Sequence, residues 1–168
     1  MRDLTNPAGQ TKSRLAVLAN EHFIIEACSN CYVPGYLIAT PRRAVESLSQ
    51  VNSATIAALG PTLAIVTAAI EAVVQPQRVY CTLFSEETRA VHFHLFPKTE
   101  WLVAKYFAAH PHETEISGPR LMDWARLTFR KPILDMDRDE TLEKIRAWLV
   151  SQSFGYSMRQ QIERCSDD

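Results

Sequence analysis

The sequence predicts an α+β fold, in which an antiparallel sheet packs against one long helix and is followed by further helices. Strand-like segments come in adjacent pairs, which is typical of antiparallel pairing and not of parallel βαβ units. One apolar segment of helical length lies between the pairs, and the last third has helical spacing. A chain of 168 residues suits one domain. We expect a single domain over 1–168, with a core at about 20–100 and a helical extension at about 101–160.

The first predicted strand pair lies near the start of the core. "FIIEA" at 23–27 and "GYLIAT" at 35–40 are rich in β-formers, and the turn signal Pro34-Gly35 separates them. Pro41 should end the second strand. Apolar residues at helical spacing in 42–51 then predict a turn or two of helix.

The longest apolar segment, residues 53–74, is about as long as a membrane span. Gly60-Pro61 interrupts it, Glu71 lies within it, and threonines and alanines dilute its hydrophobicity. We therefore expect a buried helix of a soluble protein and no membrane partner.

A second strand pair follows the helix breaker Gln75-Pro76. "RVYCTLF" at 78–84 is the first strand, and "RAVHFHLFPK" at 89–98 is the second. Three helices should complete the chain, at about 100–110, 118–129 and 137–152. Trp101, Trp124 and Trp148 fall on their apolar faces, where core packing is expected.

Overall charge gives no sign of a polyanionic partner. Eighteen basic residues against nineteen acidic ones leave a net charge of -1, which argues against nucleic acid polymers and anionic membranes as ligands. A phosphate-bearing ligand would have to be bound locally. The polar N-terminal segment lacks the apolar region of an export signal, and four cysteines are too few for a disulfide scaffold, so we expect a cytoplasmic protein with reduced thiols.

Two histidines in the last predicted strand are the main candidates for chemistry. Alternate residues of a strand share a face, so His92 and His94 should point the same way, roughly 7 Å apart. Such a pair can be a solvated face, two ligands of one metal ion, or part of a catalytic site.

The surrounding residues favour the last interpretation, because "AVHFHLFPK" resembles the motif of the histidine triad family. Ala90 stands at the position of the first histidine, and His92 and His94 match the second and third. "VPGYLIATPRRAVESLSQV" and "LGPTLAIVTAAIEAV" are similar to two further segments of that family in the same order. The resemblance covers Cys31 to Thr99, and the helical remainder is interpreted from its pattern alone.

The resemblance implies a nucleotide hydrolase or nucleotidyl transferase that acts at the α-phosphate of a dinucleoside polyphosphate or nucleoside phosphoramidate. His92 would be the nucleophile, forming a nucleotidyl-histidine, and His94 would donate a hydrogen bond to a phosphate oxygen. Tyr36 and Lys98, which lie in matched segments, are expected to contact the substrate. No cofactor is implied. The family also packs the helix corresponding to 53–74 across a two-fold axis, so we expect a homodimer.

The segment before the histidines departs from the family pattern. Glu86 and Glu87 occupy positions where hydrogen-bond donors are common, and ionised carboxylates repel phosphate. A protonated Glu86 could instead donate to the leaving group, or Ser85 or Thr88 could supply the donor. Ala90 keeps its main-chain carbonyl, with which the nucleophilic histidine hydrogen-bonds in the family. A nucleotide-binding module without catalysis therefore remains an alternative.

A small metal-binding protein that uses the two histidines is a third hypothesis. Cys28 and Cys31 form a lone CxxC pair without further ligands at suitable spacing, so we predict no zinc site. His110 and His112 flank Pro111 and are expected on an exposed loop.

Overall fold

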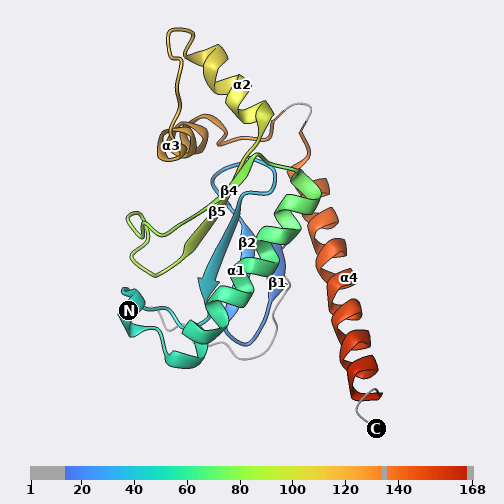
Figure 1. Ribbon diagram of the computed structural model, residues 1–168. Helices are drawn as coiled ribbons and strands as arrows, with labels where there is room; N and C mark the ends of the chain where they lie inside the picture. Colours follow the sequence, from blue (N-terminus) through green and yellow to red (C-terminus); the bar gives the residue numbers. More distant parts are fainter. Residues whose placement is uncertain (1–13, 134–135, 166–168) are drawn as a thin grey trace.

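The computed structural model describes residues 14–133 and 136–165, with backbone alone from 153 onward. The described residues form one sheet of five strands in the order β1-β2-β3-β5-β4, and every neighbouring pair is antiparallel (Figure 1). The strands are β1 Ala16–Ala19, β2 Phe23–Ala27, β3 Leu37–Pro41, β4 Arg78–Thr82 and β5 Phe93–Lys98. The predicted antiparallel α+β fold and both predicted strand pairs are confirmed.

The helices follow the predicted order. They are α1 Ser53–Val74, α2 Glu100–Ala109, α3 Gly118–Thr128 and α4 Arg138–Cys165. Asn52 caps the start of α1 by accepting from the Thr55 amide at 2.9 Å, and Gln75 ends the helix in the left-handed conformation, at a φ of 51°. The bounds of α1 therefore equal those of the apolar segment.

Helices α1 and α4 lie side by side along one face of the sheet (Figure 1). Leu142, Ile145 and Leu149 of α4 are buried in one cluster with apolar residues of α1 and of the strands, and Trp148 packs at its edge. These are the α4 positions that the helical spacing selects. The buried side chains from the sheet and α1 are Val17, Phe23, Ile25, Ala27, Leu37, Ala39, Val66, Ala69, Ile70, Val91, Phe93 and Leu95.

The opposite face of the sheet is covered in part by α2 and α3. Buried residues of both helices pack with residues around β3 and β5 in a second cluster: Cys31, Val33, Tyr36, Phe96, Leu102, Tyr106, Leu121, Met122 and Ala125. Trp101 and Trp124 pack at its edge, as expected. Gly118, at the start of α3, lies so close to the Tyr80 ring that an added Cβ would be 2.7 Å from Cζ. Helix α3 is thus seated directly on β4.

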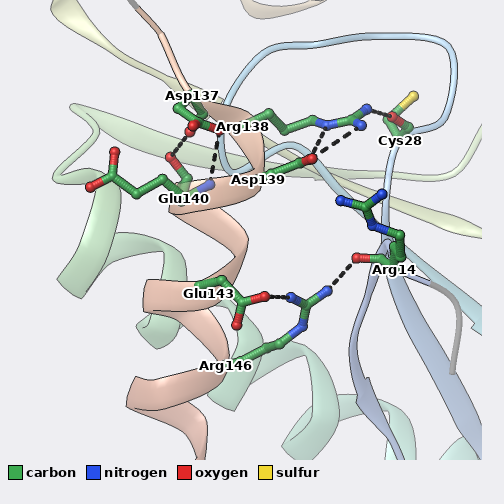
Figure 2. A network of polar contacts seen from close by, with 9 residues as sticks. Arg14, Cys28, Asp137, Arg138, Asp139, Glu140, Glu143 and Arg146 are labelled. Carbon is green, nitrogen blue, oxygen red and sulfur yellow. Dashed lines mark hydrogen bonds and ion pairs between the residues drawn. The ribbon is translucent and has the colours of Figure 1, made fainter.

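Two arginines of α4 connect this helix to the residues just before β1 and just after β2 (Figure 2). Arg146 donates to the carbonyl of Arg14, just before β1, and pairs with Glu143 at 2.6 Å. Arg138 donates to the carbonyl of Cys28 at 3.4 Å. Cys28 begins the loop between β2 and β3. The hydrogen bond from Arg138 therefore ties that loop to α4.

The structure differs from the sequence analysis at two local features. Strand β1 was not predicted. Its four residues, "AVLA", follow a polar segment and are too few to show whether the segment has strand or helix periodicity. The helix expected within 42–51 is only a 3-10 turn, Leu48–Gln50. Ser47 and Gln50 close this turn through a capping box, which satisfies its amides without a longer helix. The polar N-terminal segment behind the cytoplasmic expectation lies, up to residue 13, outside the described residues.

Helix α1 is long and apolar enough to cross a membrane by length and composition. Its inner side instead packs on the sheet, where Val66, Ala69 and Ile70 are fully buried. Its outer side is also apolar: Ile56 is 41% exposed, and Ala64 is exposed as well. The helix therefore has an apolar surface that the described residues leave uncovered.

Candidate active site

The alternation of β5 places the two histidines on the face opposite the main core. Phe93 and Leu95 are buried with α1 and α4, whereas His94 and Phe96 point to the side of α2 and α3. His92 precedes the first residue of β5, so the strand is shorter than the predicted 89–98. The His92 and His94 rings nevertheless meet, with centroids 4.7 Å apart.

The orientation of the His92 ring is set by the main chain. Its Nδ1 lies 2.8 Å from the carbonyl oxygen of Ala90, which can only accept a hydrogen bond. Nδ1 therefore carries a proton, and in the neutral ring Nε2 has the free electron pair. Ser85 Oγ donates to the same carbonyl at 3.4 Å. This is the contact that the resemblance implied for the nucleophilic histidine, kept although residue 90 is alanine.

The His94 ring is oriented by a hydrogen bond with Tyr36, whose hydroxyl lies 2.7 Å from His94 Nδ1. His94 is only 5% exposed. Its burial, and then the neighbouring His92 and Arg126, lower the pKa of His94 to about 4, so the ring is neutral near pH 7. Burial raises the pKa of Tyr36, which therefore stays a phenol and can donate to Nδ1. With Tyr36 donating, Nε2 of His94 is left as a hydrogen-bond donor.

Both histidines line a cavity of about 430 Å³, a volume within the range of small-molecule sites. The loop between β4 and β5 forms one wall and contributes Ser85, Glu86 and Thr88. Ser85 adopts the left-handed conformation, at a φ of 53°. Five of the seven site residues expected from the sequence thus line one cavity: Ser85, Glu86, Thr88, His92 and His94.

Most charged groups around this cavity are acidic. Glu26 of β2 and Asp123 of α3 join Glu86 and Glu87 in its lining. Arg126 of α3 is the only lysine or arginine among the described residues that line it. Its guanidinium pairs with Glu87 at 3.4 Å.

Comparison with known proteins finds structural neighbours only. No protein-family model and no curated protein matches the chain. A zinc-bound histidine triad family protein from Mycobacterium smegmatis matches with a TM-score of 0.58 and 14% identity, over 84% of this chain and 87% of that one. A hypothetical histidine triad nucleotide-binding protein from Sulfolobus tokodaii strain7 matches with a TM-score of 0.57 and 14% identity, over 82% and 84%. This chain has the histidine triad fold.

A third match has a different description. A structure of a uridylyltransferase matches with a TM-score of 0.58 and 16% identity, over 84% of this chain but only 43% of its own. The histidine triad fold that the sequence motifs implied is thereby confirmed, and the matches extend into the helical part that those motifs did not cover.

Tyr36 and Lys98 do not line the cavity of this histidine triad fold. Tyr36 is 1% exposed and reaches the site only through His94. Lys98 is the last residue of β5, four positions beyond His94, and pairs with Arg78 of β4. The expectation that both side chains contact the substrate is not supported by this geometry, because both lie outside the lining.

Among the described residues, none completes a set of metal ligands around the cysteine pair. Cys31 is buried in the second cluster and donates from Sγ to the Ala125 carbonyl at 3.7 Å. Burial raises the pKa of Cys31 to about 11 and also raises that of Cys28, which disfavours the thiolate forms that bind metal. In residues 14–133 and 136–165, no group of three or more His, Cys, Asp or Glu could hold a metal ion. His112 is exposed, and His110 stacks on Tyr106.

Sequence reasoning missed the contribution of α3 to this candidate site. Asp123 and Arg126 come from a helix outside the segments that carried the resemblance. The available signal was positional: Arg126 follows the buried Ala125 and lies one helical turn after the buried Met122, at the edge of the apolar stripe. That spacing places Arg126 beside a packed surface but does not say which one.

Proposed function

We propose that this protein is a cytoplasmic nucleotide hydrolase or nucleotidyl transferase acting at the α-phosphate of a dinucleoside polyphosphate or nucleoside phosphoramidate, without a cofactor. The observation that carries the proposal is the 2.8 Å contact between His92 Nδ1 and the Ala90 carbonyl. This contact leaves the other ring nitrogen as a nucleophile beside a cavity of suitable size. The names of two structural neighbours, a nucleotide-binding protein and a uridylyltransferase, agree with nucleotide chemistry.

In the first step, His92 Nε2 attacks the α-phosphorus with its electron pair, and the bond from phosphorus to the leaving group breaks. The ring becomes positively charged as the nitrogen–phosphorus bond forms. The protonated Nδ1 donates a hydrogen bond to the Ala90 carbonyl, which stabilises that charge. The product is a nucleotidyl-histidine and a free leaving group.

His94 would stabilise the negative charge that develops on a phosphate oxygen. Its low pKa keeps the ring neutral, with the Nε2 proton available for donation. A neutral donor also avoids placing a second cationic ring next to His92 while His92 becomes charged.

The leaving group takes up one proton as it departs. Ser85, Glu86 and Thr88 are the groups of the β4–β5 loop that line the cavity, and each can carry a proton. In the second step, water or another acceptor attacks phosphorus and passes its proton to the group that protonated the leaving group, the nitrogen–phosphorus bond breaks, and His92 regains its electron pair.

A nucleotide-binding module without catalysis is the second candidate, and the acidic lining favours it. Glu26, Glu86, Glu87 and Asp123 face the same cavity as the histidines, where they would disfavour a transition state with growing negative charge. The metal-binding hypothesis has less support, because the described residues offer no third ligand for the histidine pair.

The test is mass spectrometry of the protein after incubation with dinucleoside polyphosphates, nucleoside phosphoramidates and sugar-linked nucleotides. We expect a nucleotidyl adduct on His92 and slow turnover. His92→Asn should bind nucleotide but form no adduct, because the amide keeps polarity without a nucleophilic nitrogen.

The same assay separates the two candidates. If the wild-type protein binds nucleotides but forms no adduct, and Glu86→Gln combined with Ala90→His does not awaken turnover, the binding module is the better account. In an active protein, Glu86→Gln should lower the rate if Glu86 supplies the leaving-group proton. The rate should rise if the carboxylate only repels phosphate.

We also propose that two copies of this chain pair through α1. Support comes from the apolar outer side of this helix, where Ile56 is 41% exposed and small residues such as Ala64 permit close approach.

A further inference from the structure

Arg126 lies in the wall shared by two cavities. It lines the cavity of His92 and His94, and it also lines a second one of about 660 Å³ that contains Arg130. Ser29 and Glu87 belong to both linings as well. A ligand that extends from the histidines into the second cavity would therefore pass Arg126.

The Arg126 side chain is partly enclosed and already paired with an anion. It is 30% exposed, whereas its partner Glu87 is 74% exposed. An ion pair with so exposed a carboxylate contributes little free energy. An anionic ligand can displace Glu87 from the guanidinium at small cost.

The backbone of Arg126 is held by the packing of α3. The preceding Ala125 is fully buried, and its carbonyl accepts a hydrogen bond from Cys31 Sγ at 3.7 Å. Arg130 Nε donates to the Arg126 carbonyl at 3.4 Å. At the start of the helix, Gly118 packs closely on Tyr80. The guanidinium is thus presented from a fixed helix and not from a free loop.

We propose that Arg126 binds a phosphate oxygen of the substrate, and that Glu87 occupies its guanidinium when the site is empty. A planar guanidinium can make two parallel hydrogen bonds to a phosphate. Of the described residues that line the histidine cavity, no other lysine or arginine offsets its four carboxylates. This inference rests on the proposed nucleotide function, and it assigns to α3 the phosphate recognition that the acidic β4–β5 loop does not supply.

Calorimetric titration with the monophosphates of adenosine, guanosine, cytidine and uridine, and with the four free nucleosides, tests the assignment. Arg126→Gln should lower the affinity for the monophosphate that binds best by about tenfold to a hundredfold, while leaving the affinity for its nucleoside unchanged. The affinity of Arg126→Lys for the monophosphate should fall between those of the wild type and Arg126→Gln, because lysine keeps the charge but not the planar guanidinium.

Glu87→Gln tests the exchange of partners in a protein that keeps Arg126. We expect the monophosphate to bind about threefold more tightly, since no carboxylate competes for the guanidinium. The gain should shrink when the same substitution is made in the Arg126→Gln background.

Arg120→Gln is the matched control, because Arg120 lies on α3, pairs with Glu113 at 2.7 Å and lies outside the cavity lining. Its affinities should equal those of the wild type. Equal monophosphate affinity in wild type and a folded Arg126→Gln variant would overturn this inference and leave the proposed function intact. A wild-type protein that binds no nucleotide and forms no adduct on His92 would overturn both.

Discussion

The two faces of the sheet use the same strands for different purposes. On the face of α1 and α4, the alternate residues of β5 are Phe93 and Leu95, both buried among apolar side chains. On the other face, the residue between them is His94, which opens onto a cavity lined by carboxylates and Arg126. One face is therefore closed and apolar, and the other keeps an accessible polar site. The difference shows how a period of two lets one strand stabilise the fold and carry chemistry at once.

This separation predicts that substitutions on the two faces fail in different ways. A change on the closed face should reduce stability, because close packing tolerates little loss of volume. A change on the open face should alter binding, turnover or pH dependence while the fold persists. Variants of single residues test this division.

The largest effect on stability is expected for Leu95→Ala on the closed face. Leu95 is 0% exposed, and truncating a fully buried leucine costs about 2–5 kcal/mol through lost burial and the cavity left behind. Urea unfolding at fixed protein concentration measures the change. Leu127→Ala is the matched control, since Leu127 is 66% exposed, and it should change the free energy of unfolding by less than about 0.5 kcal/mol. Equal losses in the two variants would refute the division of the faces.

A smaller and pH-dependent effect is expected from His94 on the open face. Its pKa of about 4 in the folded protein lies below the 6.5 of an ordinary histidine, so the unfolded chain binds more protons between these values. The stability is therefore lost as the pH falls from about 6.5 towards 4, by about 3 kcal/mol in all.

The measurement compares wild type with His94→Asn in urea at pH 4, 5, 6 and 7. The Asn oxygen can still accept from Tyr36, but the group does not titrate, so the variant should lose less stability across this range. Carboxylates titrate in both proteins and cancel in the difference. Parallel curves would show that His94 is not held neutral by its surroundings.

The fold could be predicted from the sequence wherever a segment had a clear period or a strong terminator. The bounds of β2 and α1 agree with the prediction, because a run of β-formers marks the strand and Gln75-Pro76 ends the helix. Strand β1 could not be predicted, because four residues form a strand only when a neighbour supplies their hydrogen bonds. Arg146 of α4, which donates to the Ala16 carbonyl at 2.8 Å, holds that strand from far along the chain.

The site could be predicted only in the part that local sequence encodes. His92, His94 and the loop residues Ser85, Glu86 and Thr88 lie within ten positions of one another, so one motif located them together. Arg126 reaches the same cavity from α3, and its position depends on how that helix docks on β4. The pattern of α3 predicts a buried side but not its partner. Lys98 shows the converse, since proximity in sequence did not bring it into the cavity.

The smallest effect on the folded chain is expected on the outer side of α1, where the prediction concerns association. Ala64 is exposed, and Ala57 and Gly60 lie on the same side at helical spacing. If two copies pair through this surface, Ala64→Arg places like charges close together at the interface and should convert the dimer into a 19.0 kDa monomer. The free energy of unfolding within the subunit should change by less than about 0.5 kcal/mol, because the site is exposed.

Sedimentation velocity at micromolar concentration measures the mass, with Ala104→Arg on the exposed side of α2 as the matched control. A wild-type chain that sediments only as a monomer would reject the pairing, and a dimer that survives Ala64→Arg would move the interface away from α1.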